Sequence, residues 1–312
     1  MTASNVFNRG TGLLIIEVRH SNPNGDPDRE SDPRILDADG RGLISPVSFK
    51  RKLRDSLEDH ENIIWEELKK AVVRDSKHEF DILEKRGRRR DEIAKMGADE
   101  FLNKYWDARI FGNTFLEDNK KDKEEKDKAE KEPKSAKKGK TNEQDHFISA
   151  GVVQFGPGVS ISPVEIERLT TTNKSGVQEG KDRGMAPLGW RVVRHAVYAM
   201  PFFVNAARAK KNQCDSTDID ALKFLIPGAY RNFPSTIRTF VEIRHAWYAE
   251  HKMPLGSCPD SLILDALMPK RVKGESEKPS VSVDEYEIPA QLPGEVRERL
   301  ANFEDLCLKV WG

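Results

Sequence analysis

The sequence lacks several features that would place it quickly in a common class. It has three widely spaced cysteines and no Cys-x-x-Cys pair, which argues against a disulfide framework and a thiolate zinc site. No stretch approaches the roughly 18 apolar residues of a membrane-spanning helix. The apolar run "GLLIIEV" is short and follows polar residues, so it does not resemble a signal peptide. We therefore expect a cytoplasmic protein without a membrane partner.

The sequence also lacks an excess of charge of one sign. Its 52 Lys and Arg residues balance 52 Asp and Glu residues, which argues against a protein that coats nucleic acid by bulk attraction. A basic groove offset by acids elsewhere is still compatible with this balance, because phosphate contacts are local. The length of 312 residues predicts one large elaborated domain or two domains.

Motifs of common enzymes are missing as well. There is no His-Glu-x-x-His or Gly-x-Ser-x-Gly motif, and the histidines show no ligand-like spacing to acids. The "GKT" at 139–141 resembles a phosphate-binding loop, but that loop needs a glycine where this chain has Lys134. We therefore expect no cofactor and no bound metal.

The first elements follow from the pattern of residues 11–59. Residues 11–18 form a short apolar run that is typical of a buried strand. After a loop at 20–42, Ser45 and Pro46 are a favourable N-cap and first residue for a helix. In that helix, Phe49, Leu53 and Leu57 form a stripe that faces the core.

The rest of the chain indicates an α+β fold. Residues 60–116 have helical periodicity, whereas residues 117–140 are charged and contain no core-forming side chain, which predicts a flexible segment. From 147 onward the pattern favours strands, a protruding hairpin that returns along 191–205, a helix ending at Pro227-Gly228 and a further strand. The tail at 296–312 predicts a helix or an edge strand. Together these elements suggest a ferredoxin-like core with elaborations.

The loop "HSNPNGDPDRESDPRILDADGRG" raises the question of a metal site. An EF-hand reading that starts at Asp26 places Ser31 where glycine is required and Asp37 where glutamate is required. The same residues are good turn formers, so a purely structural loop is an alternative. Long loops in compact domains are also often functional.

The helix after this loop offers a better candidate for an anion site. Lys50 and Arg54 project from the same flank, and the helix begins at Ser45–Ser48 with a positive dipole end. This arrangement suits the phosphate backbone of a nucleic acid. The alternative is an ordinary solvated basic face.

The predicted hairpin adds further basic residues and two apolar side chains, Val177 and Met185, that could separate bases. Basic residues interleaved with apolar wedges suit a single strand with splayed bases. The RNP1 consensus of an ordinary RNA-recognition motif is absent. The hairpin candidates for RNA binding are Lys181, Arg183, Met185, Arg191 and Arg194.

Several blocks, in order, resemble one family. They are "NPNGDPD…DPRILDADGRGLISPVSFKRKLRD", "YWDARIFG", "GVVQFGPGVSISPVEI" and "PSTIRTFVEIRHAWYAEHKMPLGSCPDSLILDAL". These blocks are similar to the RAMP-type backbone subunits of type I CRISPR Cascade complexes, especially the I-C/I-B branch. The resemblance implies a subunit that polymerises along CRISPR RNA and presents it for pairing with target DNA.

The resemblance also implies a division of the chain and a set of partners. It implies an RRM-like palm, a helical fingers insertion at 60–145 and a hairpin thumb at 169–191, with palm segments at 1–59, 146–168 and 192–312. It implies RNA contacts by Ser45, Lys50 and Arg54, and the adjoining Ser48, Asn22 and Asn24 are further candidates. The implied partners are CRISPR RNA, target DNA, other copies of the chain and other Cascade subunits.

The same resemblance carries a rival function. Related backbone subunits of type III complexes cut RNA with an acidic residue of this loop and a metal ion. Asp32 and Asp37 lie in the matching region. The type I-like blocks favour a subunit without catalytic activity, and we expect DNA cutting to belong to a recruited nuclease.

Overall fold

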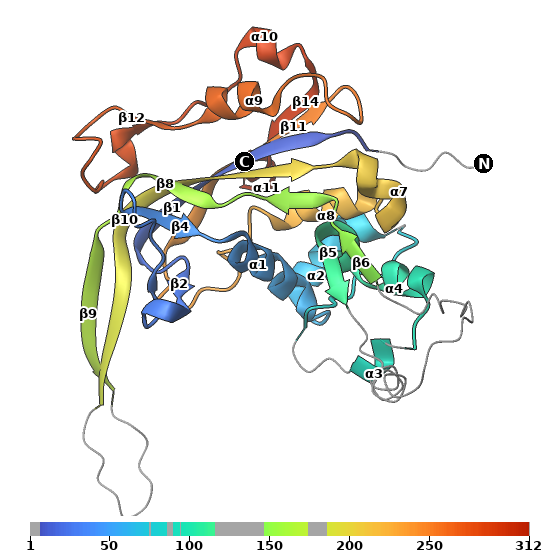
Figure 1. The fold of residues 1–312 in the computed structure, drawn as a ribbon, viewed down its shortest axis with the longest axis horizontal. Helices are drawn as coiled ribbons and strands as arrows, with labels where there is room; N and C mark the ends of the chain where they lie inside the picture. The colour runs from blue at the N-terminus through green and yellow to red at the C-terminus, as the bar shows by residue number, and fades with distance from the viewer. Residues whose placement is uncertain are drawn as a thin grey trace, which may run out of the picture.

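A computed structural model describes residues 7–74, 76–85, 90–93, 95–115, 147–173 and 186–311. Its centre is an antiparallel sheet in the order β14-β11-β1-β10-β8-β4, with β7 and β9 also paired to β10 (Figure 1). The strands of this sheet are β1 (Gly10–Ser21), β4 (Arg41–Ile44), β7 (Val153–Phe155), β8 (Gly158–Pro163), β9 (Ile166–Asn173), β10 (Ala186–Val204), β11 (Val241–His251) and β14 (Leu300–Asp305).

The central strand β1 confirms the buried strand predicted from its apolar run. Leu14 and Ile16 pack in the core on one face of the sheet, and Leu13 and Ile15 pack in a second core on the other face. Successive side chains of a strand point to opposite faces. A strand covered on both faces therefore reads as a continuous apolar run rather than an alternating one.

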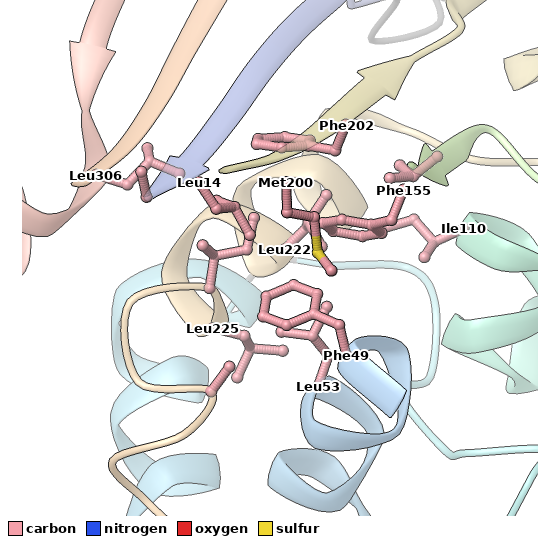
Figure 2. Packing of buried hydrophobic residues seen from close by; sticks show 14 of the residues in the cluster. Leu14, Phe49, Leu53, Ile110, Phe155, Met200, Phe202, Leu222, Leu225 and Leu306 are labelled. Carbon is pink, nitrogen blue, oxygen red and sulfur yellow. The ribbon is translucent and has the colours of Figure 1, made fainter. Parts of the chain in front are cut away.

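Helices cover the first face of the sheet. Phe49 and Leu53 of α1 point towards Leu222 and Leu225 of α8 beneath the strands (Figure 2). Together with Leu57, the two α1 residues confirm the predicted stripe. The helices of the described residues are α1 (Pro46–Glu58), α2 (Ile63–Leu68) with a π-helical continuation (Lys69–Val73), α3 (Arg90–Ile93), α4 (Ala98–Lys104), α5 (Trp106–Phe111), α7 (Ala209–Asn212), α8 (Ser216–Leu225), α9 (Asp260–Leu267), α10 (Gly294–Arg297) and α11 (Leu306–Trp311).

The second face is covered by the segment between β11 and β14. Ile263 and Leu267 of α9 and Tyr286 of the small β12–β13 pair (Lys270–Arg271 and Tyr286–Glu287) pack in the second core with Leu13 and Trp247. In Figure 1 this segment lies on the side of the sheet opposite α1 and α8. Much of the second face is therefore used for packing.

The predicted helical stretch at 60–116 is only partly helical. Tyr105 is extended between α4 and α5, and Gly112 ends α5 with a φ of 79°. Residues Gly112–Phe115 then form β5, which pairs with β6 (Phe147–Ala150). Helical periodicity alone missed this strand because its partner lies more than 30 residues along the chain.

One buried ion pair anchors this helical segment to α8. Arg109 and Asp218 are both completely buried, and their closest atoms, Nη2 and Oδ1, lie 2.9 Å apart. Arg109 also donates to the backbone carbonyls of Glu79, Leu102 and Asn103 at 2.7–2.8 Å. Each N–H of this guanidinium thus has an acceptor, which a buried charge requires.

The hairpin and the tail follow the predictions closely. β9 pairs with β10 from Ile166↔Val193 to Asn173↔Ala186 and extends away from the sheet (Figure 1). The tail forms both predicted alternatives, the edge strand β14 followed by α11. The charged segment 117–140 lies outside the described residues. No helix of the described ranges is long and apolar enough to span a membrane.

Candidate nucleic-acid interface

Backbone pairing within the aspartate-rich loop (residues 20–42) holds its conformation. A short β2–β3 pair (Gly25–Asp26 with Asp32–Pro33) encloses a 3-10 turn at Pro27–Arg29, and Ile35 bridges to Gly42. Glu30 and Ser31 adopt left-handed backbone conformations with φ of 51° and 65°. Such conformations are uncommon for residues other than glycine and often mark functional loops.

Two asparagines join this loop to its surroundings. Asn24 accepts a hydrogen bond from the backbone N–H of Ser45 at 2.8 Å. Asn22 donates to the backbone carbonyl of Ser31 at 2.8 Å and to that of Arg191 at 3.4 Å. Both side chains are buried, so each of these predicted RNA-binding residues holds the loop in place. The buried Oδ1 of Asn22 has no hydrogen-bond donor in the described structure.

The start of α1 confirms the predicted cap. Ser45 has an extended backbone, and its Oγ accepts from the N–H of Ser48 at 3.2 Å, while Pro46 opens the helix. Because Asn24 fixes the N–H of Ser45, the loop and the N-terminus of α1 form one unit. This unit places the positive end of the helix dipole beside the loop.

Lys50 lies half-buried in the second turn of α1. Its Nζ is 5.1 Å from the centre of the Phe111 ring, and no carboxylate of the described residues lies within 4 Å of it. Burial lowers the pKa of Lys50 below its ordinary value, and the nearby charge of Arg54 lowers it further. An anionic ligand close to Lys50 would stabilise its charged form and so offset this decrease in pKa.

Arg54 differs from Lys50, although both project from the same flank. Its side chain is only 6% exposed, and its Nε donates to Asp107 at 2.8 Å. Its Nη1 lies 3.2 Å from Glu84. The charge of this predicted RNA-binding residue is therefore already paired inside the fold. Its guanidinium also lies 5.2 Å from the centre of the Phe111 ring, so Phe111 lies close to both Lys50 and Arg54.

The arginines of the hairpin are paired as well. Arg191 lies 2.5 Å from Asp32 and 3.2 Å from Glu30, and its hydrogen bond to Asp32 raises the pKa of Arg191. Arg194 lies 3.1 Å from Glu165 and 3.6 Å from Glu167. The loop acids thus approach the foot of the hairpin.

The two candidate catalytic acids occupy different ion pairs. Asp32 is paired with Arg191, whereas Asp37 is 78% exposed and paired with Arg29 at 2.7 Å. Within the described ranges, no group of three or more His, Cys, Asp or Glu side chains could hold a metal ion. Asp32 and Asp37 thus each pair with a different arginine.

The remaining hairpin candidates cannot be placed. Val177, Lys181, Arg183 and Met185 lie outside the described residues, and their RNA contacts stay predictions.

The structure adds residues that the sequence reading missed. A hollow of about 190 Å³ lies at the foot of the hairpin, lined by Asn22, Ser31, Arg168, Trp190 and Arg191 among others. Arg168 and Arg191 are directly opposite each other in the β9–β10 ladder, and like charges so placed repel unless acids offset them. In the sequence, the only sign of this hollow is that Trp190 lies next to Arg191 in the predicted hairpin.

Comparisons with known proteins give the family of the chain. The model of the family "CRISPR-associated protein Cas7" matches residues 8–291. A CRISPR-associated protein Cas7 from Haloferax volcanii is 28% identical over 235 residues, which are 72% of this chain and 65% of that protein. The chain therefore spans just under two thirds of this relative's length.

Two solved structures also resemble the chain at a distance. One is a chain of a CRISPR RNA-guided surveillance complex, with 15% identity and a TM-score of 0.41, covering 78% of this chain and 69% of that one. The other is a chain of such a complex in a pre-nicking state, with 15% identity and a TM-score of 0.42, covering 78% of each chain. The family match covers nearly the whole sequence, and on that evidence the chain belongs to the CRISPR-associated protein Cas7 family.

Proposed function

We propose that this protein is a CRISPR RNA-binding backbone subunit of a type I Cascade complex of the I-C/I-B branch. Several copies polymerise along one guide RNA, bind other Cascade subunits and present the guide for pairing with target DNA. The observation that carries the proposal is Lys50, a half-buried cation without a close carboxylate beside the capped N-terminus of α1. A phosphate of an RNA backbone supplies the missing partner.

We also propose an RRM-like palm with helical fingers and a hairpin thumb. The strand order β11-β1-β10-β8, with α1 after β1 and α8 between β10 and β11, supports a ferredoxin-like palm. The fingers correspond to 60–145, the thumb to 169–191, and the palm to 1–59, 146–168 and 192–312.

The packing of the sheet supports RNA binding on the side of the helices. The second face is covered largely by α9 and the β12–β13 pair, so it offers little surface for bases. The capped end of α1, the aspartate-rich loop and the foot of the hairpin lie together on the other side (Figure 1). There, the hollow beside Trp190 and Arg168 offers aromatic and guanidinium planes, which suit stacking with an unpaired base.

We propose that this subunit has no catalytic activity and that a recruited nuclease cuts the DNA. The ion pairs of Asp32 and Asp37 with separate arginines support this assignment over the ribonuclease rival. In this arrangement the protein reads the backbone, while base pairing supplies the sequence specificity.

The test compares Lys50→Ala with Lys278→Ala. Lys278 is an exposed lysine paired with Glu275, in the segment that covers the second face of the sheet. We expect Lys50→Ala to weaken binding of fluorescently labelled RNA equally for several guide sequences. The slope of log affinity against log salt should fall by about 0.7 for each lost phosphate contact. Lys278→Ala should leave both quantities unchanged.

A second variant separates charge from shape. Lys50→Arg keeps a cation at the position, and we expect it to recover part of the salt dependence that Lys50→Ala loses. Equal RNA affinity and equal salt slopes for Lys50→Ala and the unmodified protein would refute a phosphate contact at Lys50.

A further inference from the structure

We propose that Lys50 is a site of acylation by acyl phosphates, which would neutralise a cation of the RNA interface. The acylation itself depends only on the surroundings of Lys50. Its effect on RNA rests on the proposed function. Three properties of the site support it: the isolation of the amine from carboxylates, its nucleophilicity and the anionic character of the donor that the site attracts.

The first property sets Lys50 apart from the other partly buried lysines of the described residues, Lys52, Lys104 and Lys223, which each have a carboxylate oxygen within 4 Å of the ammonium. Lys52, Lys70, Lys223 and Lys278 each have a carboxylate oxygen 2.7–3.7 Å from the ammonium. Such a partner holds the proton on the nitrogen. Lys50 instead lies over the ring of Phe111 at 5.1 Å, with its stem partly buried against the helical segment.

The second property is the availability of the uncharged amine. Burial and the charge of Arg54 lower the pKa of Lys50, and Glu84 opposes them only in part. Arg54 and Glu84 are the charged groups of the described residues that act on Lys50, and Arg54 is itself paired with Asp107 and Glu84. By contrast, the hydrogen bond with Glu67 raises the pKa of the exposed Lys70. At a given pH near 8, more of Lys50 is therefore in its nucleophilic form.

The third property favours an anionic donor over a neutral one. Lys50 lies on a 13-residue helix whose N-terminus is capped by Ser45, and long side chains of a helix lean towards its N-terminus. The positive dipole end and the ammonium of Lys50, which is unpaired among the described residues, attract a phosphate group. The features that suit an RNA phosphate thus also suit the phosphate of an acyl phosphate.

The chemistry needs no further reactant. The lone pair of the Lys50 amine attacks the carbonyl carbon of the acyl phosphate and forms a C–N bond. The C–O bond to phosphate breaks, phosphate leaves with the bonding electrons, and the proton on nitrogen passes to water. The product is a neutral amide without the ammonium charge, which cannot pair with an RNA phosphate.

The experiment treats the full-length, RNA-free protein with acetyl phosphate between pH 7 and 9 and follows each lysine by mass spectrometry. We expect Lys50 to be acetylated several-fold faster than Lys70 and Lys278. The rate at Lys50 should level off at a lower pH than the rate at Lys70. Inorganic phosphate should slow the reaction at Lys50 and not at Lys70, because it competes for the anion site.

A neutral acetylating reagent, an N-hydroxysuccinimide ester, tests the preference for an anionic donor. With this reagent the advantage of Lys50 over Lys70 should shrink, because a neutral donor gains nothing from the anion site. Acetylation of Lys50 no faster than that of Lys70 by acetyl phosphate would overturn the proposal, whatever the RNA affinity of the Lys50 variants.

A final comparison links the modification to RNA. Acetyl phosphate should lower the RNA affinity of the unmodified protein and have little effect on that of Lys50→Arg, which lacks the reactive amine. An equal loss of RNA affinity in both proteins would show that acetylation at other residues causes the loss. It would overturn the proposed effect of Lys50 acylation on RNA binding. If Lys50 is acetylated selectively but Lys50→Ala binds RNA normally, the acylation site stands and the RNA contact fails.

Discussion

The arginines of the hairpin and Lys50 of α1 are similar basic residues in the sequence, but their surroundings differ in the fold. Arg191 and Arg194 each contact two carboxylates, whereas Lys50 has none within 4 Å among the described residues. An RNA phosphate that approaches the hairpin arginines must compete with Asp32, Glu30, Glu165 and Glu167. One that approaches Lys50 displaces no close carboxylate. The availability of a cation thus depends on the acids that the fold brings to it.

Arg54 is more deeply buried than Arg191 and Arg194, and its buried partner is Asp107. Removal of Asp107 should give the largest change in stability. Asp107→Ala removes the buried carboxylate partner of the Arg54 guanidinium and an acceptor for the backbone N–H of Leu83. Loss of one partner of a buried pair costs about 3–5 kcal/mol. We expect a decrease of that size in the free energy of unfolding, measured by urea denaturation.

Glu84→Ala is the matched control for Asp107→Ala. It removes the second carboxylate of Arg54, which is 55% exposed, and should affect stability far less. Similar losses of unfolding free energy for the two variants would show that the buried pair of Arg54 with Asp107 matters no more than its exposed contact with Glu84.

Loss of the acid in the pair at the foot of the hairpin, Arg191–Asp32, should increase RNA binding. Asp32→Asn removes the closest carboxylate of Arg191 and leaves that arginine more available. We expect RNA affinity to rise a few-fold and the salt slope to steepen by up to about 0.7. Labelled-RNA binding across a salt series measures both changes.

The same variant also tests the ribonuclease rival. If complementary RNA is cut by the assembled complex in Mg²⁺ and Asp32→Asn abolishes the cuts, then Asp32 is catalytic and its pairing with Arg191 is not its main role. Weaker RNA binding by Asp32→Asn would contradict the competition between acid and phosphate.

The smallest effect should come from the most exposed pair. Asp37→Ala breaks the contact with Arg29, and such surface pairs contribute little to stability in water. We expect the urea midpoint and RNA affinity to stay within error of the unmodified protein. A clear change in either would show that the loop uses Asp37 for more than a surface contact.

Local patterns predicted much of the fold correctly. The apolar run of β1, the Ser45–Pro46 start of α1 and its core stripe depend on neighbouring residues, so they could be read directly. The strand β5 could not, because its backbone is extended only through pairing with the distant β6. The cover on the second face was also missed, because its cohesion depends on residues such as Ile263 and Tyr286 meeting β1.

The candidate site was predictable in position but not in detail. The helix start and the shared flank of Lys50 and Arg54 could be located from residue spacing alone. The pairing of Arg54 with Asp107 could not, because 53 residues separate them and only the folded chain brings them together. The same holds for Arg191 and Asp32, and for the hollow beside Trp190, whose walls come from the loop, the hairpin and Ile237.

The anchor of the helical segment has a consequence for how the sequence can vary. Arg109 binds backbone carbonyls at 79, 102 and 103, and every residue type carries a backbone carbonyl. Substitutions at these three positions therefore leave the acceptors in place, whereas Arg109 and Asp218 must keep their own side chains. The identity of residues 79, 102 and 103 can therefore change without loss of these three hydrogen bonds to the buried guanidinium.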